Sequence, residues 1–594
     1  MLEQTVKLNR RYRHISASTT IILGPDTMLI IKNNYFTRAL PSLALAAISL
    51  LSAPALANGK PDIQALSDTV RVLASDAFGG RAPGTEYETK TITYLVDRFE
   101  ALGLTPGGDD GSWTQKIGLN HTQLQQNPRI EFQQGAQNQN LIQGQDLEIS
   151  TVLATDAINI DAAPIVFVGY GANAPERDWD DFGDIDLTGK VAIFLVNDPD
   201  FEALSTDAVA GRFGGKRMTY YGRWTYKFEE AARRGALAAL VIHETAGAGY
   251  GWQVAASSPG ENYAIALAKH APQPLSLQGW LHLDTAKALF RRAGRQFEAE
   301  KRLAQSSDFK AFELEGVTFN AAISVNRKQI QSSNVLALLP GTSQKAEYLM
   351  VSSHWDAYGQ GAPDAQGRTV RPGANDDALG TAGVIELARI LASGPPLARS
   401  IIFAVWTAEE SGLLGSTAYA QNPVFPIERT ALNLTLDILQ TAGPAHDVIL
   451  VGEGQSDLEG DLARAAARQG RVVTPENLPE NGLFFRADHF SMARVGVPVL
   501  LLMGIAGGAD LVTGGRAAGD QWIKDYIGNC YHQTCDVWDP NWDLRGAAQD
   551  IELFQMILQD LGNSTRWPQW QDGSEFKAIR EQSQFTRTGS GSLP

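Results

Sequence analysis

The sequence predicts an α/β protein: a doubly wound, mainly parallel mixed sheet flanked by helices, with a smaller α/β domain inserted into it. Two observations predict this class. From about residue 330 onward, short apolar runs alternate with amphipathic helical segments, which is typical of a parallel sheet covered on both faces. Between about residues 126 and 320, short β-like runs instead alternate with loops rich in Gly, Asp and Asn, which indicates a separate module.

Residues 1–57 have the pattern of a secretory signal peptide, and Met28 would open a signal of normal length, so we expect the start of translation near Met28. The apolar run Ala39–Leu51 is too short to span a bilayer comfortably, and Ala55-Leu56-Ala57 follows it as a small-x-small cleavage site. A buried N-terminal helix is the alternative. No later run reaches transmembrane length, so we expect an exported protein, periplasmic or extracellular, without a membrane span.

Residues 58–125 are predicted to form the N-terminal part of the main domain. Apolar residues recur with the 3.6-residue period of a helix in Ile63–Leu73 and again in Ile92–Leu102. Thr85 and Glu88 are spaced as a capping box at the start of the second helix. Two amphipathic helices are therefore expected before the inserted module.

Residues 126–325 are predicted to be that inserted domain. Its strands are expected at Ile165–Val168, Val191–Val196 and Ala238–Ile242. A helix at Tyr226–Arg234 is expected to precede the last of these strands.

Residues 326–575 are predicted to return to the main domain, and residues 576–594 to form a flexible tail. Strands are expected at Tyr348–Ser353, Ser400–Trp406, Leu432–Leu436, Val448–Val451 and Val497–Met503. Helices are expected at Leu379–Ala392, Asp457–Arg468 and Ala547–Leu561. In such sheets ligands gather beyond the carboxyl ends of the strands, so the residues after each strand are candidates for function.

The charge and cysteine counts exclude several classes of protein. The 66 acidic residues outnumber the 50 basic residues and give a net charge of −16, so a nucleic-acid partner would be repelled. Two cysteines exclude a disulfide scaffold and an all-thiolate metal site. Nine histidines leave imidazole–carboxylate metal chemistry open.

Residues able to bind a metal ion follow the predicted strands. They are His354 and Asp356, Asp376 and Asp377, Glu409 and Glu410, Asp437, and His532 in a loop past the last strand. Taken singly, each has an ordinary alternative: a strand-end hydrogen bond, a helix N-cap or a solvated acidic face. Together and in this order, they predict a hydrolase with two metal ions.

A bridging carboxylate is required by this chemistry, because two divalent cations about 3.5–4 Å apart repel each other. Asp376 is the candidate bridge, since a carboxylate can offer one oxygen to each ion. Asp356 lies two residues after His354 and could accept its imidazole N–H, which would fix the tautomer. Glu409 and Glu410 are adjacent and should point differently, which suits one metal ligand and one free base.

Six short motifs occur in order along the chain. They are HWD (354–356), GANDDALG (373–380), EE (409–410), LTLD (434–437), FRADH (485–489) and YH (531–532). Together they resemble family 28 of the metallopeptidases, the co-catalytic zinc aminopeptidases. The stretch LASDAFGGRAPGT (73–85) is similar to the family's N-terminal lead-in, and residues 126–325 look like a protease-associated domain. The resemblance implies the zinc exopeptidase fold and two zinc ions per chain.

The resemblance also implies a role for each site residue. One zinc would be held by His354, Asp376 and Asp437, and the other by Asp376, Glu410 and His532. Glu409 would be the general base, Tyr531 would stabilise the oxyanion, and Arg486 would contact the substrate. Asp488 and His489 are assigned structural roles.

The expected activity is removal of N-terminal residues from peptides by a zinc-dependent exopeptidase. A carboxypeptidase or dipeptidase is the alternative, and it would need cationic groups for the substrate's carboxylate, of which Arg486 is one. A non-catalytic binding protein on the same fold and a one-zinc enzyme that cyclises N-terminal glutamine are further alternatives. Cys530 and Cys535 flank His532 and could form a local disulfide in an oxidising compartment, with two buried thiols or soft metal ligands as the alternatives.

Overall fold

Parallel strands form the centre of the fold. The computed structural model describes residues 59–126, 128–256, 260–266 and 274–584, and the predicted signal peptide lies outside these residues. The strands pair in parallel in the order β21-β18-β14-β17, and their bounds are Val499–Leu502, Thr430–Leu436, Gln344–His354 and Arg399–Trp406. On the far side of β17, β13 (Phe312–Leu339) pairs antiparallel. The predicted mainly parallel mixed sheet is confirmed.

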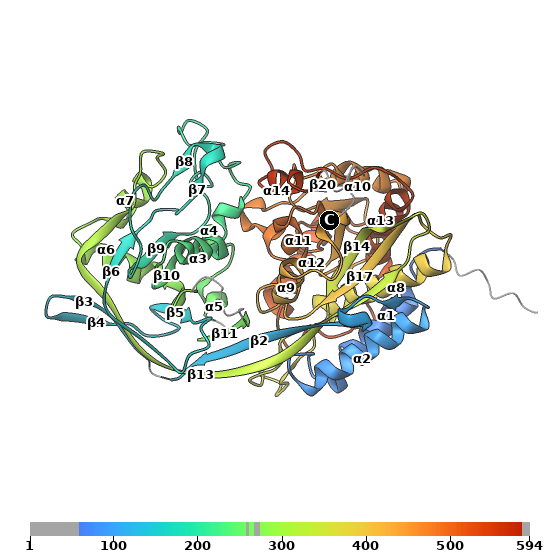
Figure 1. Ribbon diagram of the computed structural model, residues 1–594, viewed down its shortest axis with the longest axis horizontal. Helices are drawn as coiled ribbons and strands as arrows, with labels where there is room; N and C mark the ends of the chain where they lie inside the picture. Colours follow the sequence, from blue (N-terminus) through green and yellow to red (C-terminus); the bar gives the residue numbers. More distant parts are fainter. Residues whose placement is uncertain (1–58, 127, 257–259, 267–273, 585–594) are drawn as a thin grey trace, which may run out of the picture. The chain divides into compact units, whose positions relative to one another are not determined.

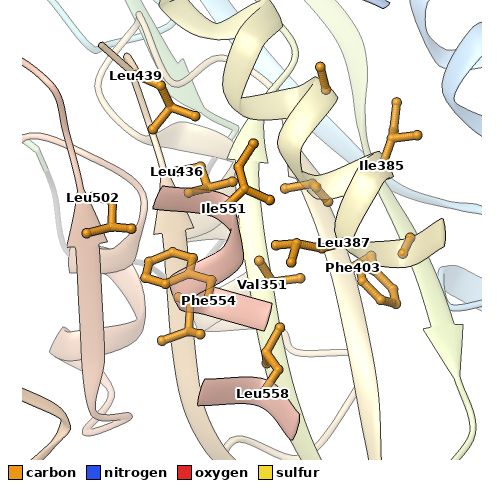
Figure 2. Packing of buried hydrophobic residues seen from close by; sticks show 14 of the residues in the cluster. Val351, Ile385, Leu387, Phe403, Leu436, Leu439, Leu502, Ile551, Phe554 and Leu558 are labelled. Atoms are coloured by element: carbon orange, nitrogen blue, oxygen red, sulfur yellow. The ribbon is translucent and has the colours of Figure 1, made fainter. Parts of the chain in front are cut away.

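One face of this sheet is covered by α8 (Leu379–Ser393) and α13 (Arg545–Gly562). Both helices match the predicted segments to within two residues. Figure 2 shows Ile551 of α13 beside Leu436 and Val351, which point from the strands toward the helices. These side chains are fully buried and belong to the largest apolar core.

The opposite face is covered by α9 (Leu414–Gln421) and α11 (His489–Arg494). Met350 of β14 and Trp406 of β17 pack here with Tyr419 of α9 in a second core. The residues next to them in the strands, Val351 and Val405, belong to the first core on the other face. Because successive strand residues point to opposite faces, the near-continuous apolar runs of the sequence require both faces to be covered. The sheet is therefore doubly wound, as predicted.

Two helices precede the inserted module, as the sequence predicts. They are α1 (Ile63–Leu73) and α2 (Glu86–Ala101), and both pack into the first core. The predicted capping box is wrong in detail, because Thr85 makes no side-chain cap and Glu88 accepts a hydrogen bond from Gly84 N instead. Among the described residues, no helix combines the length and the apolar character needed to cross a membrane.

The inserted segment forms a second run of parallel strands. They pair in the order β6-β9-β10-β12, with bounds Ala157–Phe167, Val191–Leu195, Ala238–His243 and Leu277–His282. The helix α3 (Trp224–Arg233) precedes β10. The three predicted strands and the predicted helix are all present.

The strand β13 runs through both groups of strands and is visible as a long ribbon in Figure 1. Its first half pairs with β6 and with β3 (Arg129–Gln134), and its second half pairs with β2 (Thr114–Leu124) and β17. The predicted domain boundary at residue 325 therefore falls inside one strand.

Two C-terminal segments differ from the predicted pattern. The run Val448–Val451 becomes β19 (Asp447–Leu450), which pairs with β20 (Val472–Pro475) in a separate two-stranded sheet. The start of the predicted tail forms α14 (Lys577–Glu581), in which Arg580 is buried. Residues 585–594 lie outside the described part of the chain.

Candidate metal centre

The predicted ligands lie at the carboxyl edge of the central sheet. His354 is the last residue of β14, Asp437 directly follows β18, and Glu409 and Glu410 lie in the loop after β17. Asp376 lies in the short turn that leads into α8. Because the strands are parallel, their carboxyl ends meet at one edge and bring these residues together.

The first group consists of His354, Asp376 and Asp437, all buried. His354 Nε2 lies 3.3 Å from Asp376 Oδ1 and 4.0 Å from Asp437 Oδ1. The ligand atoms of the three residues lie within 4.8 Å of one another, a spacing that a single metal ion could bridge.

The second group shares Asp376 with the first and adds Glu410 and His532. His532 Nε2 lies 3.2 Å from Asp376 Oδ2 and 3.4 Å from Glu410 Oε2. The His532 side chain is 27% exposed, so this group is open to solvent on one side. Each oxygen of Asp376 thus faces a different imidazole.

The atoms of these groups fit divalent metal ions. His354 Nε2 and Asp437 Oδ1 are both buried without a hydrogen-bond partner. A buried polar atom without a partner costs free energy, which a coordinated cation would recover. One imidazole with carboxylate oxygens in each group is a donor set that zinc accepts.

The acidic side chains of the candidate centre raise one another's pKa values, because they lie close together and are buried. Burial and the charge of Asp376 raise the pKa of Asp437 to about 8. Burial, Asp437 and Asp488 likewise raise the pKa of Glu409 well above its ordinary value, although His354 opposes them. Burial would also raise the pKa of Asp376, but the imidazoles of His354 and His532, 3.3 and 3.2 Å from its two oxygens, hold it below its ordinary value. Bound cations would favour the ionised form of every carboxylate here.

Glu409 and Glu410 face different imidazoles. Glu409 Oε2 lies 3.8 Å from His354 Nε2, whereas Glu410 belongs to the His532 group. The carboxylate of Asp356 accepts hydrogen bonds from the backbone N–H of Glu409 at 3.0 Å and of Glu410 at 3.4 Å. His354 Nδ1 lies 3.2 Å from the Asp356 carbonyl oxygen and 3.6 Å from its Oδ1, so the backbone oxygen is its nearer partner.

The remaining predicted residues surround these groups. The Tyr531 ring packs on His532 with centroids 3.6 Å apart, and the Arg486 guanidinium lies 5.4 Å from the centre of the Tyr250 ring. Asp488 and His489 are buried and belong to neither ligand group. Asp488 nevertheless contributes charge to the centre, because it raises the pKa of Glu409.

The loop that carries His532 is fixed at two points. Cys530 and Cys535 are joined in a disulfide, as the sequence allowed. Asp536, which sequence reasoning missed, accepts hydrogen bonds from the backbone N–H groups of Asn375 at 3.0 Å and Asp376 at 3.1 Å. Asp536 therefore ties the His532 loop to the bridging carboxylate.

Arg81 is a second residue that sequence reasoning missed. It is fully buried in the turn-rich loop before α2. Its guanidinium donates hydrogen bonds to the carbonyl oxygens of Trp355 (2.6 Å), Pro372 (2.6 Å), Gly373 (2.8 Å) and Leu73 (2.9 Å). One side chain thus joins the loop after His354 to the loop before Asp376.

Replacing Arg81 with methionine is expected to lower the free energy of unfolding by about 3 kcal/mol or more, because four buried carbonyl oxygens lose a charged donor. Urea unfolding of the metal-free protein, prepared with a chelator, measures this loss in the free energy of unfolding. Arg71→Met is the control, since Arg71 makes an exposed ion pair with Asp68 worth about 1 kcal/mol or less. Equal losses in both variants would contradict the assigned role of Arg81.

Comparisons with known proteins point to one family. The sequence model of Peptidase family M28 matches residues 334–554. The chain is 28% identical over 239 residues to an aminopeptidase of Pseudomonas aeruginosa strain UCBPP-PA14, which covers 39% of this chain and 42% of that protein. It is 28% identical over 155 residues to a probable lipoprotein aminopeptidase of Mycobacterium tuberculosis strain H37Rv. That alignment covers 26% of this chain and 27% of that protein. Among solved structures it is similar to the aminopeptidase from Aneurinibacillus sp. strain AM-1, with 18% identity, a TM-score of 0.45, and coverage of 84% of this chain and 93% of that one.

The fold and the paired ligand groups define an α/β protein with a candidate two-ion metal centre. Residues 334–554, which contain all of the candidate ligands, match the sequence model of peptidase family M28. The resemblance seen in the sequence motifs is confirmed for this part of the chain. The alignments span less than half of the length of the two curated relatives.

Proposed function

We propose that the protein is an exported zinc aminopeptidase that removes N-terminal residues from peptides. The match of residues 334–554 to peptidase family M28, and the similarity to two proteins named as aminopeptidases, support this function. Residues 1–57 would serve as the signal peptide, and residues 126–325 as a protease-associated domain.

The observation that carries the proposal is the position of Asp376 between two imidazoles. Its Oδ1 lies 3.3 Å from His354 Nε2, and its Oδ2 lies 3.2 Å from His532 Nε2. His354, Asp376 and Asp437 would hold one zinc ion, and Asp376, Glu410 and His532 the other. When bound, such a pair would polarise the scissile carbonyl and lower the pKa of a water molecule toward neutrality.

The proton transfers would fall to Glu409. It would accept a proton from the attacking water and donate it to the leaving amine. Its backbone N–H is held by Asp356 and its carboxylate lies beside His354, so its position is set by two separate contacts. The Tyr531 hydroxyl would donate a hydrogen bond to the oxyanion, and Arg486 would contact the substrate.

Zinc-loaded protein is expected to release nitroaniline from leucine nitroanilide, and chelation is expected to lower kcat/KM by at least about a hundredfold. Zinc should restore the activity, and elemental analysis should find two ions per chain. N-acetyl-leucine nitroanilide is the matched control and should not be cleaved. Chelator-resistant activity, or comparable cleavage of the blocked substrate, would contradict the proposal.

A further inference from the structure

The His532 imidazole packs against two tyrosine rings. The centre of the Tyr358 ring lies 4.5 Å from the centre of the imidazole, and the centre of the adjacent Tyr531 ring lies 3.6 Å from it. Tyr358 also lines a small cavity together with Asp376, Glu410 and His532. The Tyr358 ring therefore lies at the second ligand group, although no sequence motif assigns it a role.

The imidazoles of the two ligand groups are held in different ways. His354 Nδ1 lies 3.2 Å from the carbonyl oxygen of Asp356, so a hydrogen bond can set the tautomer and the orientation of that ring. In the described part of the chain, the polar contacts of the His532 ring are made by Nε2, with Asp376 and Glu410. Packing against aromatic rings is therefore the contact that can orient the rest of this imidazole.

The backbone beside Tyr358 is fixed by the turn-rich loop before α2. The N–H of Gly359 donates a hydrogen bond to the carbonyl oxygen of Gly80 at 2.9 Å. Gly359 has a φ of +67°, and a Cβ at this position would lie 2.6 Å from the Cβ of Ala82. The two segments thus meet so closely that only glycine fits at residue 359. Tyr358 therefore projects from a segment whose position is set by main-chain contacts.

We propose that Tyr358 is a positioning residue, whose ring holds the His532 imidazole in the orientation that lets Nε2 bind the second zinc ion. This inference rests on the proposed function, because it concerns one of the two ions of that centre. The face of a tyrosine ring attracts positive charge, and coordination to zinc makes an imidazole more positive. The packing therefore favours the metal-bound histidine over the metal-free one, so Tyr358 raises the zinc affinity of this group without being a ligand.

Three variants test the aromatic contact. Tyr358→Leu removes the ring but keeps an apolar side chain, and it is expected to lower the zinc affinity of the second group by about two- to tenfold, the range of one aromatic pair. Tyr358→Phe keeps the ring and should keep the wild-type affinity. Tyr263→Leu is the matched control, because the Tyr263 ring packs on His121 at the same centroid distance of 4.5 Å but outside both ligand groups. It should leave the zinc affinity unchanged.

Two backgrounds assign the effect to one ligand group. Asp437→Asn protein keeps the His532 group intact, and in it Tyr358→Leu should lower the zinc affinity by the same factor. His532→Ala protein lacks the imidazole on which Tyr358 packs, and in it Tyr358→Leu should change nothing. Equilibrium dialysis against zinc buffers measures all of these affinities. An equal loss in both backgrounds would indicate a general effect on the fold and would overturn the inference.

The dialysis measurements use no peptide, which separates this inference from the proposed function. A protein that cleaves no peptide but loses zinc affinity in Tyr358→Leu alone would sink the peptidase function and retain the role of Tyr358. Unchanged affinity in Tyr358→Leu with a raised KM for leucine nitroanilide would make Tyr358 a substrate contact and overturn the inference. A loss in Tyr358→Phe as large as that in Tyr358→Leu would also overturn it, because the ring is retained. Fewer than two zinc ions in the wild-type protein would overturn both proposals.

Discussion

Replacing Glu409 with glutamine is expected to lower kcat by about a hundred- to ten-thousandfold while both zinc ions stay bound, because a general base contributes that much to a hydrolytic rate. The amide keeps the shape of the side chain and its backbone contact with Asp356. It cannot accept the proton of the attacking water. Steady-state kinetics together with elemental analysis measure the two effects separately.

Glu410→Gln is the variant to compare with Glu409→Gln, because the two glutamates are adjacent in sequence but lie beside different imidazoles. Glu410 Oε2 lies 3.4 Å from His532 Nε2, so its loss should weaken metal binding to the second group. The two variants should therefore differ in metal content as well as in rate. Near-normal turnover in metal-loaded Glu409→Gln protein would refute the role of Glu409 as the base.

Replacing Asp376 with asparagine is expected to weaken metal binding in both groups at once, by at least about a hundredfold. Loss of a residue that merely supports a ligand already costs ten- to a hundredfold in metal affinity. Asp376 is also the one residue common to both ligand groups of the described chain, and an amide can offer only one oxygen. Activity at limiting zinc should fall below detection.

Single-group variants provide the contrast for Asp376→Asn. Asp437→Asn and His532→Ala each remove a ligand from one group only, so each should retain about one tightly bound ion. Equilibrium dialysis against a zinc buffer measures the stoichiometry. Two tightly bound ions in Asp376→Asn protein would contradict the bridging role.

The strand ends could be predicted because the sequence marks them clearly. His354 and Asp437 directly follow long apolar runs, and such runs become strands that are buried on both faces. The parallel arrangement then brings the ligands to one edge without further information. His532 could be predicted only from the YH motif (531–532), because it lies in a loop rather than at a strand end.

Other features could not be predicted because their partners are backbone atoms distant in sequence. Arg81 binds carbonyl oxygens of residues 355, 372 and 373, and Asp536 binds amides of residues 375 and 376. No local pattern encodes such contacts. The strand Val448–Val451 was misplaced for a related reason, since a short apolar run does not specify which strand it will join.

The 28-residue strand β13 has a consequence for how this chain can change. Deleting residues 126–325 would cut β13 internally and leave its second half without the preceding backbone. Deleting only the residues before β13, with β3 and β6 among them, would keep the strand whole but leave its first half as an exposed edge, with unpaired amides open to pairing with another chain. The segment predicted to be an inserted domain therefore cannot be removed alone, because β13 belongs both to it and to the sheet that carries the candidate ligands.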